Sequence, residues 1–443
     1  MTNTLNELAI ADFLLFGSHT WLDKSITPFA DIQKLPPASS LSWSGGELVI
    51  KPYWDFPLEV PLLKYKNDQD YIEHFRTVFK ICVQDRLRCD RAVIAMSGGM
   101  DSTAVAATAC QLVGEGASST QLQAVTAVYD HIHPDRERYF AGLVAKKLEL
   151  PIDYFVCDNY ALLQPPCPPV EPSENYTPIQ GVDLARRMAS YSPVLLTGDC
   201  ADNLLCLPPS PTIFSRLRQK NLLAIVQEAL QLKLRHNIRL SLGTGLIAKF
   251  RGRSRQNSDA PAYAFPSWLN PSFTERLQLR ERWQQVWSWH PSPLNQRHPA
   301  VHRWMVFPNW YRESEYLDET KSHALENRDP FLDLRLIELI LAISPYPWLF
   351  RKYLIRRAMQ EVLPDPVVQR PKTPLGNLQD SLVRRAGTDW LDRWKPVPEL
   401  SAYIVSHEIP KITSAEIGSE GIYTGLRPLL LNLWLVHLNN TIS

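Results

Sequence analysis

Short apolar segments alternate with helix-like segments between residues 71 and 196, and this alternation constrains the fold more than any other feature of the sequence. Apolar runs such as RAVIAM (91–96) are each followed by residues with the three-to-four-residue spacing of a helix. Short strands alternating with helices predict an α/β fold, with a parallel sheet of about five strands and helices on both faces. The expected strands are 91–96, 123–129, 152–157 and 194–196, and the expected helices include 135–148 and 181–190.

The segments on either side of this alternation differ from it. Residues 5–16 have the spacing of a short amphipathic helix, and 41–53 contain a strand-rich patch too small to be a robust domain alone. After a proline-dense loop at 163–178 and the last predicted strand, the chain is expected to be mainly helical to its C-terminus. The polar, basic segment 251–262 lacks periodicity and is expected to be a mobile surface loop.

Composition argues against several classes of function. The 443 residues carry 47 Lys and Arg against 46 Asp and Glu, so no nucleic-acid or anionic-membrane partner is expected. The apolar runs are too short for a membrane span, and the N-terminus lacks the pattern of a signal peptide. The 7 cysteines are scattered without a CxxC pair, which disfavours a disulfide framework or a zinc site. These features predict a cytoplasmic protein.

The motif SGGMDS follows one predicted strand and opens the next helix. Gly98 and Gly99 permit a backbone that aims consecutive N–H groups at an anion, while the helix N-terminus adds partial positive charge. Ser97 and Ser102 supply hydroxyl donors. The lysine of an ATPase-type phosphate loop is missing, and Asp101 would repel phosphates unless Mg²⁺ bridged them. The alternative is an ordinary glycine turn with a capping aspartate.

SGGMDS resembles the pyrophosphate-binding loop of the N-type ATP pyrophosphatases, and more narrowly of the asparagine synthetase family. That family includes β-lactam synthetases and macrolactam-forming lasso-peptide cyclases. The resemblance implies an adenine nucleotide alpha hydrolase-like fold, and five ordered motifs make it specific for the superfamily but not for a substrate. The other motifs are LPPASSLSW…YWD (35–55), LLTGDCADNLL (195–205), ENRDPFLD (326–333), and the series KYLIRRAMQEVLP (352–364) with QRPKTP (369–374).

The resemblance implies that ATP adenylates a carboxylate, releasing pyrophosphate, and that an amine then attacks the acyl-adenylate. Asp202 stands at the family's second metal-ligand position, so Asp101 and Asp202 are expected to share Mg²⁺; the alternative for Asp202 is a helix N-cap. Backbone groups near Met96 and Val128 match positions that hold adenine, and Lys352 matches a phosphate-contacting lysine or is an exposed helix residue. The full expected nucleotide set is Met96, Ser97, Gly98, Gly99, Asp101, Ser102, Val128, Gly198 and Lys352.

Catalytic roles are also implied by the resemblance. Lys372 falls on the lysine that, in β-lactam synthetases, stabilises charge during adenylation and amide formation; otherwise it is a solvated surface lysine. Asp199 stands where β-lactam synthetases carry a tyrosine and asparagine synthetases a glutamate, and it is expected to take the amine proton. Glu313 and Glu315 both lie near the position of the glutamate that pairs with that tyrosine. Glu326 remains open between a site role and a structural ion pair.

The N-terminus departs from asparagine synthetases, which begin with a glutaminase domain whose nucleophile is a cysteine at position 2. Here that position is Thr2, and the first cysteine is Cys82. Residues 1–60 are therefore interpreted as the remnant of a glutaminase-like domain and 70–443 as the ligase domain, with no glutamine hydrolysis expected. The RPK spelling at 370–372 is closer to β-lactam synthetases and cyclases.

These features predict an AMP-forming amide ligase that uses ATP and Mg²⁺. The preferred specific hypothesis is a lasso-peptide-type macrolactam cyclase, acting on a peptide or small molecule that bears both carboxylate and amine. Such a cyclase would work with a leader protease and a leader-binding protein. The alternatives are an asparagine synthetase-like amidotransferase using free ammonia, with or without a separate glutaminase subunit, and a non-catalytic nucleotide-binding partner. Tryptophans between 283 and 304 belong either to a core or to a peptide pocket.

Overall fold

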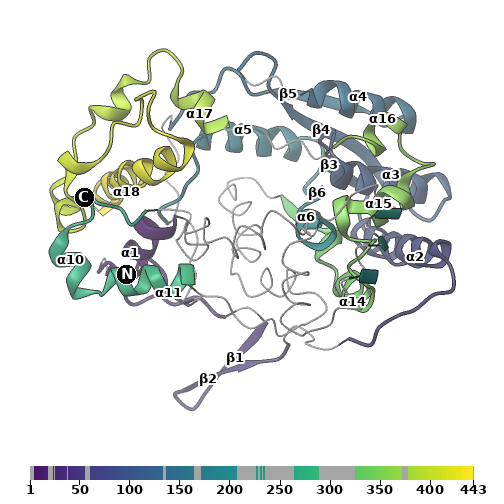
Figure 1. Ribbon diagram of the computed structural model, residues 1–443, viewed down its shortest axis with the longest axis horizontal. Coiled ribbons are helices and arrows are strands. Elements are labelled where there is room, and N and C mark those ends of the chain that lie inside the picture. The colour runs from purple at the N-terminus through teal and green to yellow at the C-terminus, as the bar shows by residue number, and fades with distance from the viewer. Residues whose placement is uncertain are drawn as a thin grey trace.

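A parallel sheet of five strands lies among the helices on the right of Figure 1. Its order is β5-β4-β3-β6-β7, so the chain runs outward from β3 through β4 to β5 and then returns to the other side of β3. Ligands bind beyond the carboxyl ends of the strands at such a reversal. The strands are β3 (Arg91–Ala95), β4 (Gln121–Val128), β5 (Ile152–Val156), β6 (Val194–Leu196) and β7 (Glu326–Arg328).

The sheet of this computed structural model confirms the predicted α/β fold. The sequence predicted four of its strands but not β7. The three residues of β7 are Glu, Asn and Arg, which have no apolar pattern and pair with β6 only through the backbone ladder. The residues that the structure describes are 4–17, 23, 25–36, 38–54, 60–132, 136–163, 171–206, short pieces within 226–234, 264–288, 325–371 and 378–442.

Helices cover both faces of the sheet because neighbouring residues of each strand point to opposite sides. On β3, Ile94 faces the main core, whereas Val93 faces a smaller cluster that contains Met188. Met188 belongs to α5 (Pro178–Ala189), which covers that second face. The main core is built with α2 (Asp68–Arg86), α3 (Met100–Gly114), α4 (Glu137–Leu148), α14 (Leu334–Ala342), α15 (Tyr353–Met359) and α16 (Asp365–Val368).

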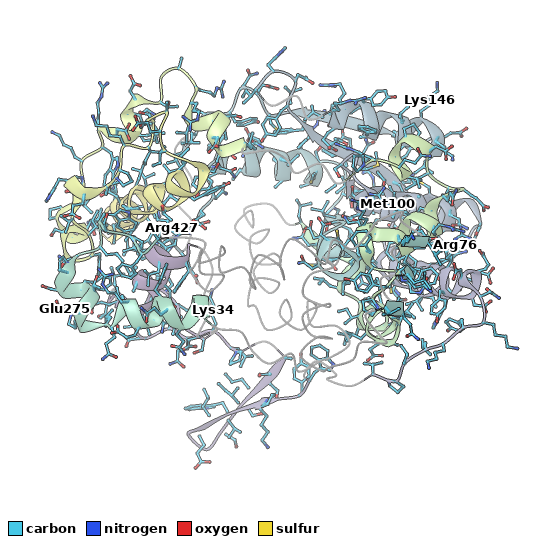
Figure 2. All side chains as sticks on the ribbon, viewed as in Figure 1. Lys34, Arg76, Met100, Lys146, Glu275 and Arg427 are labelled. Atoms are coloured by element: carbon cyan, nitrogen blue, oxygen red, sulfur yellow. The ribbon has the colours of Figure 1, made fainter. Side chains whose placement is uncertain are left out.

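A second core joins the two ends of the chain. Helix α1 (Glu7–Phe16) packs on α18 (Ser419–Ile442), together with α10 (Pro271–Arg276), α11 (Leu279–Ser288) and α17 (Leu378–Val383). Arg427 of α18 is buried among these helices (Figure 2). It donates to the carbonyl of Leu15 at 2.7 Å and pairs with Glu174 at 2.9 Å. The predicted N-terminal helix is thus held by the C-terminal helical part.

A β-hairpin projects from the rest of the molecule (Figure 1), within the predicted strand-rich patch. Its strands are β1 (Ser39–Ser44) and β2 (Glu47–Pro52), joined by a Gly-Gly turn with positive φ at both glycines. The register places Leu41 opposite Ile50 and Trp43 opposite Leu48, so one face of the ribbon is apolar. All four side chains are largely exposed, with Trp43 at 67%.

The remaining short elements are connectors. They are α6 (Ala201–Leu205), η2 (Pro330–Leu332), η3 (Phe350–Lys352), η4 (Asp389–Asp392), η5 (Pro398–Ala402) and η6 (Ser406–Glu408). The predicted loop at 251–262 lies outside the described residues. Among the helices that the structure describes, none has both the length and the apolar character needed to cross a bilayer.

Candidate active site

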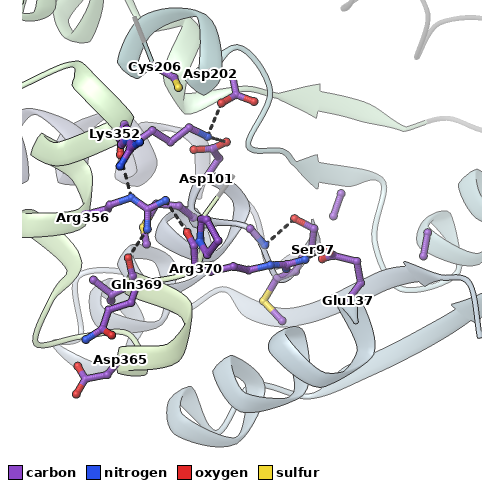
Figure 3. A pocket seen from close by; sticks show the side chains of 18 of the residues that line it. Ser97, Asp101, Glu137, Asp202, Cys206, Lys352, Arg356, Asp365, Gln369 and Arg370 are labelled. Carbon is purple, nitrogen blue, oxygen red and sulfur yellow. Dashed lines mark hydrogen bonds and ion pairs between the residues drawn. The ribbon is translucent and has the colours of Figure 1, made fainter. Parts of the chain in front are cut away.

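A pocket of about 1090 Å³ opens at the carboxyl ends of β3 and β4, at the reversal of strand order (Figure 3). Its walls come from the loop after β3, from Ala127 near the end of β4 and Tyr129 just after it, and from Met188 of α5. The opposite wall is formed by α15 and by the segment that ends at Pro371. The predicted loop therefore lines a cavity large enough for a nucleotide and a second ligand.

The SGGMDS loop is held by its own hydroxyl groups. The Ser97 amide donates to Ser102 Oγ at 2.9 Å, the two serine hydroxyls are 3.0 Å apart, and the Gly99 amide donates to Ser97 Oγ at 3.1 Å. The Gly98 amide donates to a carboxylate oxygen of Glu137. Three consecutive amides that were expected to face an anion thus have partners within the protein. The first turn of α3, which begins at Met100, still directs its positive end toward the pocket.

Asp101 and Asp202 converge on one cation. The ammonium group of Lys352 forms an ion pair with Asp101 and another with Asp202, whose Oδ1 lies 2.6 Å from Nζ (Figure 3). Lys352 is 6% exposed and adopts a left-handed backbone conformation with φ of 61°. The two carboxylates therefore reach the same point in space, as a shared cation requires.

This donor set fits Mg²⁺. The ion prefers carboxylate, phosphate and water oxygens and is usually bound in proteins by one or two carboxylates plus substrate phosphates. Among the described residues no group of three or more His, Cys, Asp or Glu side chains forms a self-sufficient metal cage. The pair Asp101 and Asp202 thus suits a metal that arrives with a nucleotide.

Arg356 fixes the wall opposite the loop. Its guanidinium donates to the carbonyls of Arg351 at 2.9 Å and Arg370 at 2.7 Å, and also to that of Val368. Burial lowers the pKa of Arg356, while the nearby charge of Asp101 acts in the other direction. Arg356 was not selected from the sequence, although it belongs to the quoted segment KYLIRRAMQEVLP.

A second buried pair, Glu137 and Arg370, was also missed. Their side chains are 2.7 Å apart, and both line the pocket (Figure 3). Arg370 was quoted within QRPKTP but received no role. Glu137 stands at the start of α4, where an acidic residue is common, so the sequence offered no signal for a site role.

The loop after β6 lies against the SGGMDS helix at Gly198. A Cβ atom at Gly198 would come within 2.5 Å of the Ser102 amide nitrogen, so only glycine allows this approach. Beside it, the Thr197 hydroxyl donates to Asp329 and accepts from the Asp199 amide at 3.1 Å. Burial raises the pKa of Asp329. Asp199 is exposed on this loop and is not among the described lining residues of the pocket.

The Gly198→Ala variant is expected to lose about 1–3 kcal/mol of unfolding free energy, because the new methyl group must push the two loops apart. The measurement is urea unfolding of the purified chain. Gly114→Ala is the matched control, since no atom lies within 4 Å of the Cβ position there and helical Gly→Ala changes stabilise by about 0.5–1 kcal/mol. Equal stability of the two variants would show that the loops do not meet closely.

Of the two predicted adenine-binding positions, Met96 lines the pocket and Val128 is not among its described lining residues. Met96 lines the pocket, with its amide donating to Val125 and its carbonyl accepting from Thr126. Val128 is fully buried, and its carbonyl accepts from Cys157 at 2.9 Å, so its neighbours on β4 line the cavity instead.

Three predicted catalytic residues, Lys372, Glu313 and Glu315, lie outside the residues that the structure describes. Lys372 directly follows Pro371, which lines the pocket.

The sequence left Glu326 open between a role in the site and a structural ion pair. Glu326 forms an ion pair with Arg328 at 2.8 Å and lies in register with Val194. That register is the amino end of the strands, away from the pocket, which favours the structural interpretation.

Trp283 packs in the second core, whereas Trp289 and Trp304 lie outside the described residues.

The structure is an α/β domain in which the glycine-rich SGGMDS loop lies beside two carboxylates, Asp101 and Asp202, that both pair with Lys352. The profile of the family described as asparagine synthase matches residues 74–406, and the chain therefore belongs to the asparagine synthase family. It carries the ATP-dependent, amide-forming domain of that family, whose members use ATP and Mg²⁺; no glutaminase domain is matched. No curated protein matches the chain.

Proposed function

We propose that this protein is an AMP-forming amide ligase that joins a carboxylate and an amine of one peptide substrate, as a macrolactam cyclase of the lasso-peptide type. The observation that carries the ligase part is the convergence of Asp101 and Asp202 on one cation beside the SGGMDS loop. A peptide substrate is supported by pocket size, because about 1090 Å³ lies at the upper end of the usual range for ligand pockets, about 300–1,000 Å³, and leaves room beside a nucleotide.

In this proposal the chain's residues bind and orient the nucleotide. The Ser97 hydroxyl lines the pocket at the positive end of α3, where it can donate to a phosphate oxygen, while the buried Ser102 hydroxyl holds the loop. Asp101 and Asp202 would hold Mg²⁺, which neutralises the triphosphate when bound. In the structure the Lys352 ammonium group occupies the point between these carboxylates, and beside a bound Mg²⁺ it would keep a further positive charge at the same end of the pocket.

Amide formation is assigned to Lys372, Asp199 and one of two glutamates. Lys372, one residue beyond the lining residue Pro371, would stabilise negative charge in both half-reactions. Asp199, with Glu313 or Glu315, would accept the proton of the attacking amine. A leader protease and a leader-binding protein are the partners that this role requires.

The test is mass spectrometry of AMP and product with a candidate precursor peptide. Lys372→Ala is expected to lower AMP formation by about a hundred- to thousandfold, because charge develops in both steps. Asp199→Asn is expected to form and hydrolyse the acyl-adenylate but to slow capture by the amine about a hundredfold or more.

Normal cyclisation by Asp199→Asn would place the base elsewhere. If ammonium ions and free aspartate support AMP formation while peptides do not, the chain is instead an ammonia-dependent amidotransferase. Binding of MgATP without AMP formation from any substrate would leave the non-catalytic nucleotide-binding role, and failure to bind MgATP would refute the proposed function.

A further inference from the structure

Glu137 and Arg370 form a buried, charge-balanced pair at the phosphate end of the pocket. Arg370 Nη2 lies 2.7 Å from Glu137 Oε1, and each side chain is only 11% exposed. The other carboxylate oxygen of Glu137 accepts from the Gly98 amide, in the middle of the SGGMDS loop. One carboxylate thus binds both the loop and the arginine.

Neighbouring groups restrict the position of the Arg370 side chain beside the SGGMDS loop. The Arg370 guanidinium lies over the Phe140 ring, 4.2 Å from its centroid. A Cβ at Gly98 would come within 2.4 Å of Phe140 Cβ and 2.7 Å of Arg370 Nη1. The loop therefore needs glycine at this position because the arginine and the ring lie directly against its backbone.

The same arginine connects the loop to the opposite wall. Its own carbonyl is held by Arg356, four residues after Lys352, so the SGGMDS loop and the segment leading to Lys372 are fixed relative to each other. Both Glu137 and Arg370 line the pocket beside Ser97.

We infer that Arg370 binds the β- and γ-phosphate end of the nucleotide and that Glu137 is a positioning residue that aims it there. This inference rests on the proposed nucleotide-dependent function. A guanidinium has five N–H donors in a rigid fork, so it can donate to Glu137 and to phosphate oxygens together. Glu137 alone would repel a triphosphate, and it is tolerated at this place because Arg370 neutralises it.

The experiment measures binding of inorganic pyrophosphate, MgATP and AMP to the full chain by calorimetry. Arg370→Met is expected to weaken pyrophosphate and MgATP binding about 10- to 100-fold, since a charge-assisted hydrogen bond is lost and an unneutralised carboxylate remains. AMP affinity is expected to change less than about threefold, because AMP lacks the β- and γ-phosphates. Glu137→Gln keeps an acceptor for Gly98 and is expected to have a smaller effect of the same kind.

The double variant Glu137→Gln/Arg370→Met separates a binding role from a structural one. Removing both charges is expected to restore the melting temperature toward that of the wild type, because no buried charge is left alone. Pyrophosphate affinity is expected to stay at least about tenfold below the wild type, since the donor is still missing. If Arg370→Met alone fails to fold, the double variant still allows pyrophosphate affinity to be measured without Arg370.

Arg138→Ala is the matched control, on the same helix and in an exposed ion pair with Asp130, and all three affinities are expected to stay unchanged. Recovery of pyrophosphate binding together with stability in the double variant would overturn the inference. Wild-type protein that binds neither pyrophosphate nor MgATP would refute the proposed function itself.

Discussion

The Asp101→Asn variant is expected to lose AMP formation by about a thousandfold or more while keeping its fold. The change is isosteric, but it removes one of the two charges that meet at the cation position next to the phosphate loop. Metal and charge clamps of this kind supply several kcal/mol of transition-state stabilisation, which corresponds to this range of rates. The measurement is release of AMP and pyrophosphate from MgATP, with circular dichroism to verify the fold.

Asp130→Asn is the control for this variant, since Asp130 is paired with the exposed Arg138 and is not a described lining residue. It is expected to retain normal activity. Full activity of Asp101→Asn would refute the metal assignment, whereas equal loss in both variants would point to a general sensitivity to lost carboxylates.

The Arg282→Met variant is expected to lose about 3–5 kcal/mol of unfolding free energy in urea titration. Arg282 of α11 forms two hydrogen bonds of 2.6 Å with Asp12 of α1, and the Asp12 side chain is only 1% exposed. Removing the arginine takes the counter-charge away from a buried carboxylate, which costs more than the pair itself contributes.

Arg276→Met provides a comparison on the neighbouring helix. Arg276 of α10 also pairs with α1, through Glu7, but these side chains are 53% and 38% exposed. Solvent screens an exposed pair, so the expected loss is about 0–1 kcal/mol. A large loss in both variants would mean that any disturbance of α1 unfolds the second core, and that burial of the charge is not the cause.

Local patterns predicted the sheet because each element carries its own signal. The apolar runs and helical spacing placed β3 to β6 within a few residues, and the SGGMDS order placed Asp101 at the start of α3. β7 lacked an apolar pattern, so its membership of the sheet depends on the tertiary contact with β6. The residues of β7 alone therefore do not predict that this segment joins the sheet.

The site was predicted less completely for the same reason. Asp101, Asp202 and Lys352 were named through resemblance, and the structure brings all three together. Glu137 and Arg370 were not, because they are 233 residues apart and each is an ordinary residue in its own segment. Their role depends on a shared neighbour, the Gly98 amide, which no spacing in the sequence reveals.

The meeting of α1 with α18 also determines when each part of the chain can fold during synthesis. Arg427 and the Leu15 carbonyl that it binds are 412 residues apart, so α1 leaves the ribosome long before the α18 helix that it packs on. At about 5–20 residues per second, this delay is roughly 20–80 s. Among the residues that the structure describes, the buried members of the sheet core end at Val368, so this core can form while the apolar α1 is still without α18. A newly made chain therefore exposes the apolar side chains of α1 to aggregation, and to chaperones, until α18 has been made.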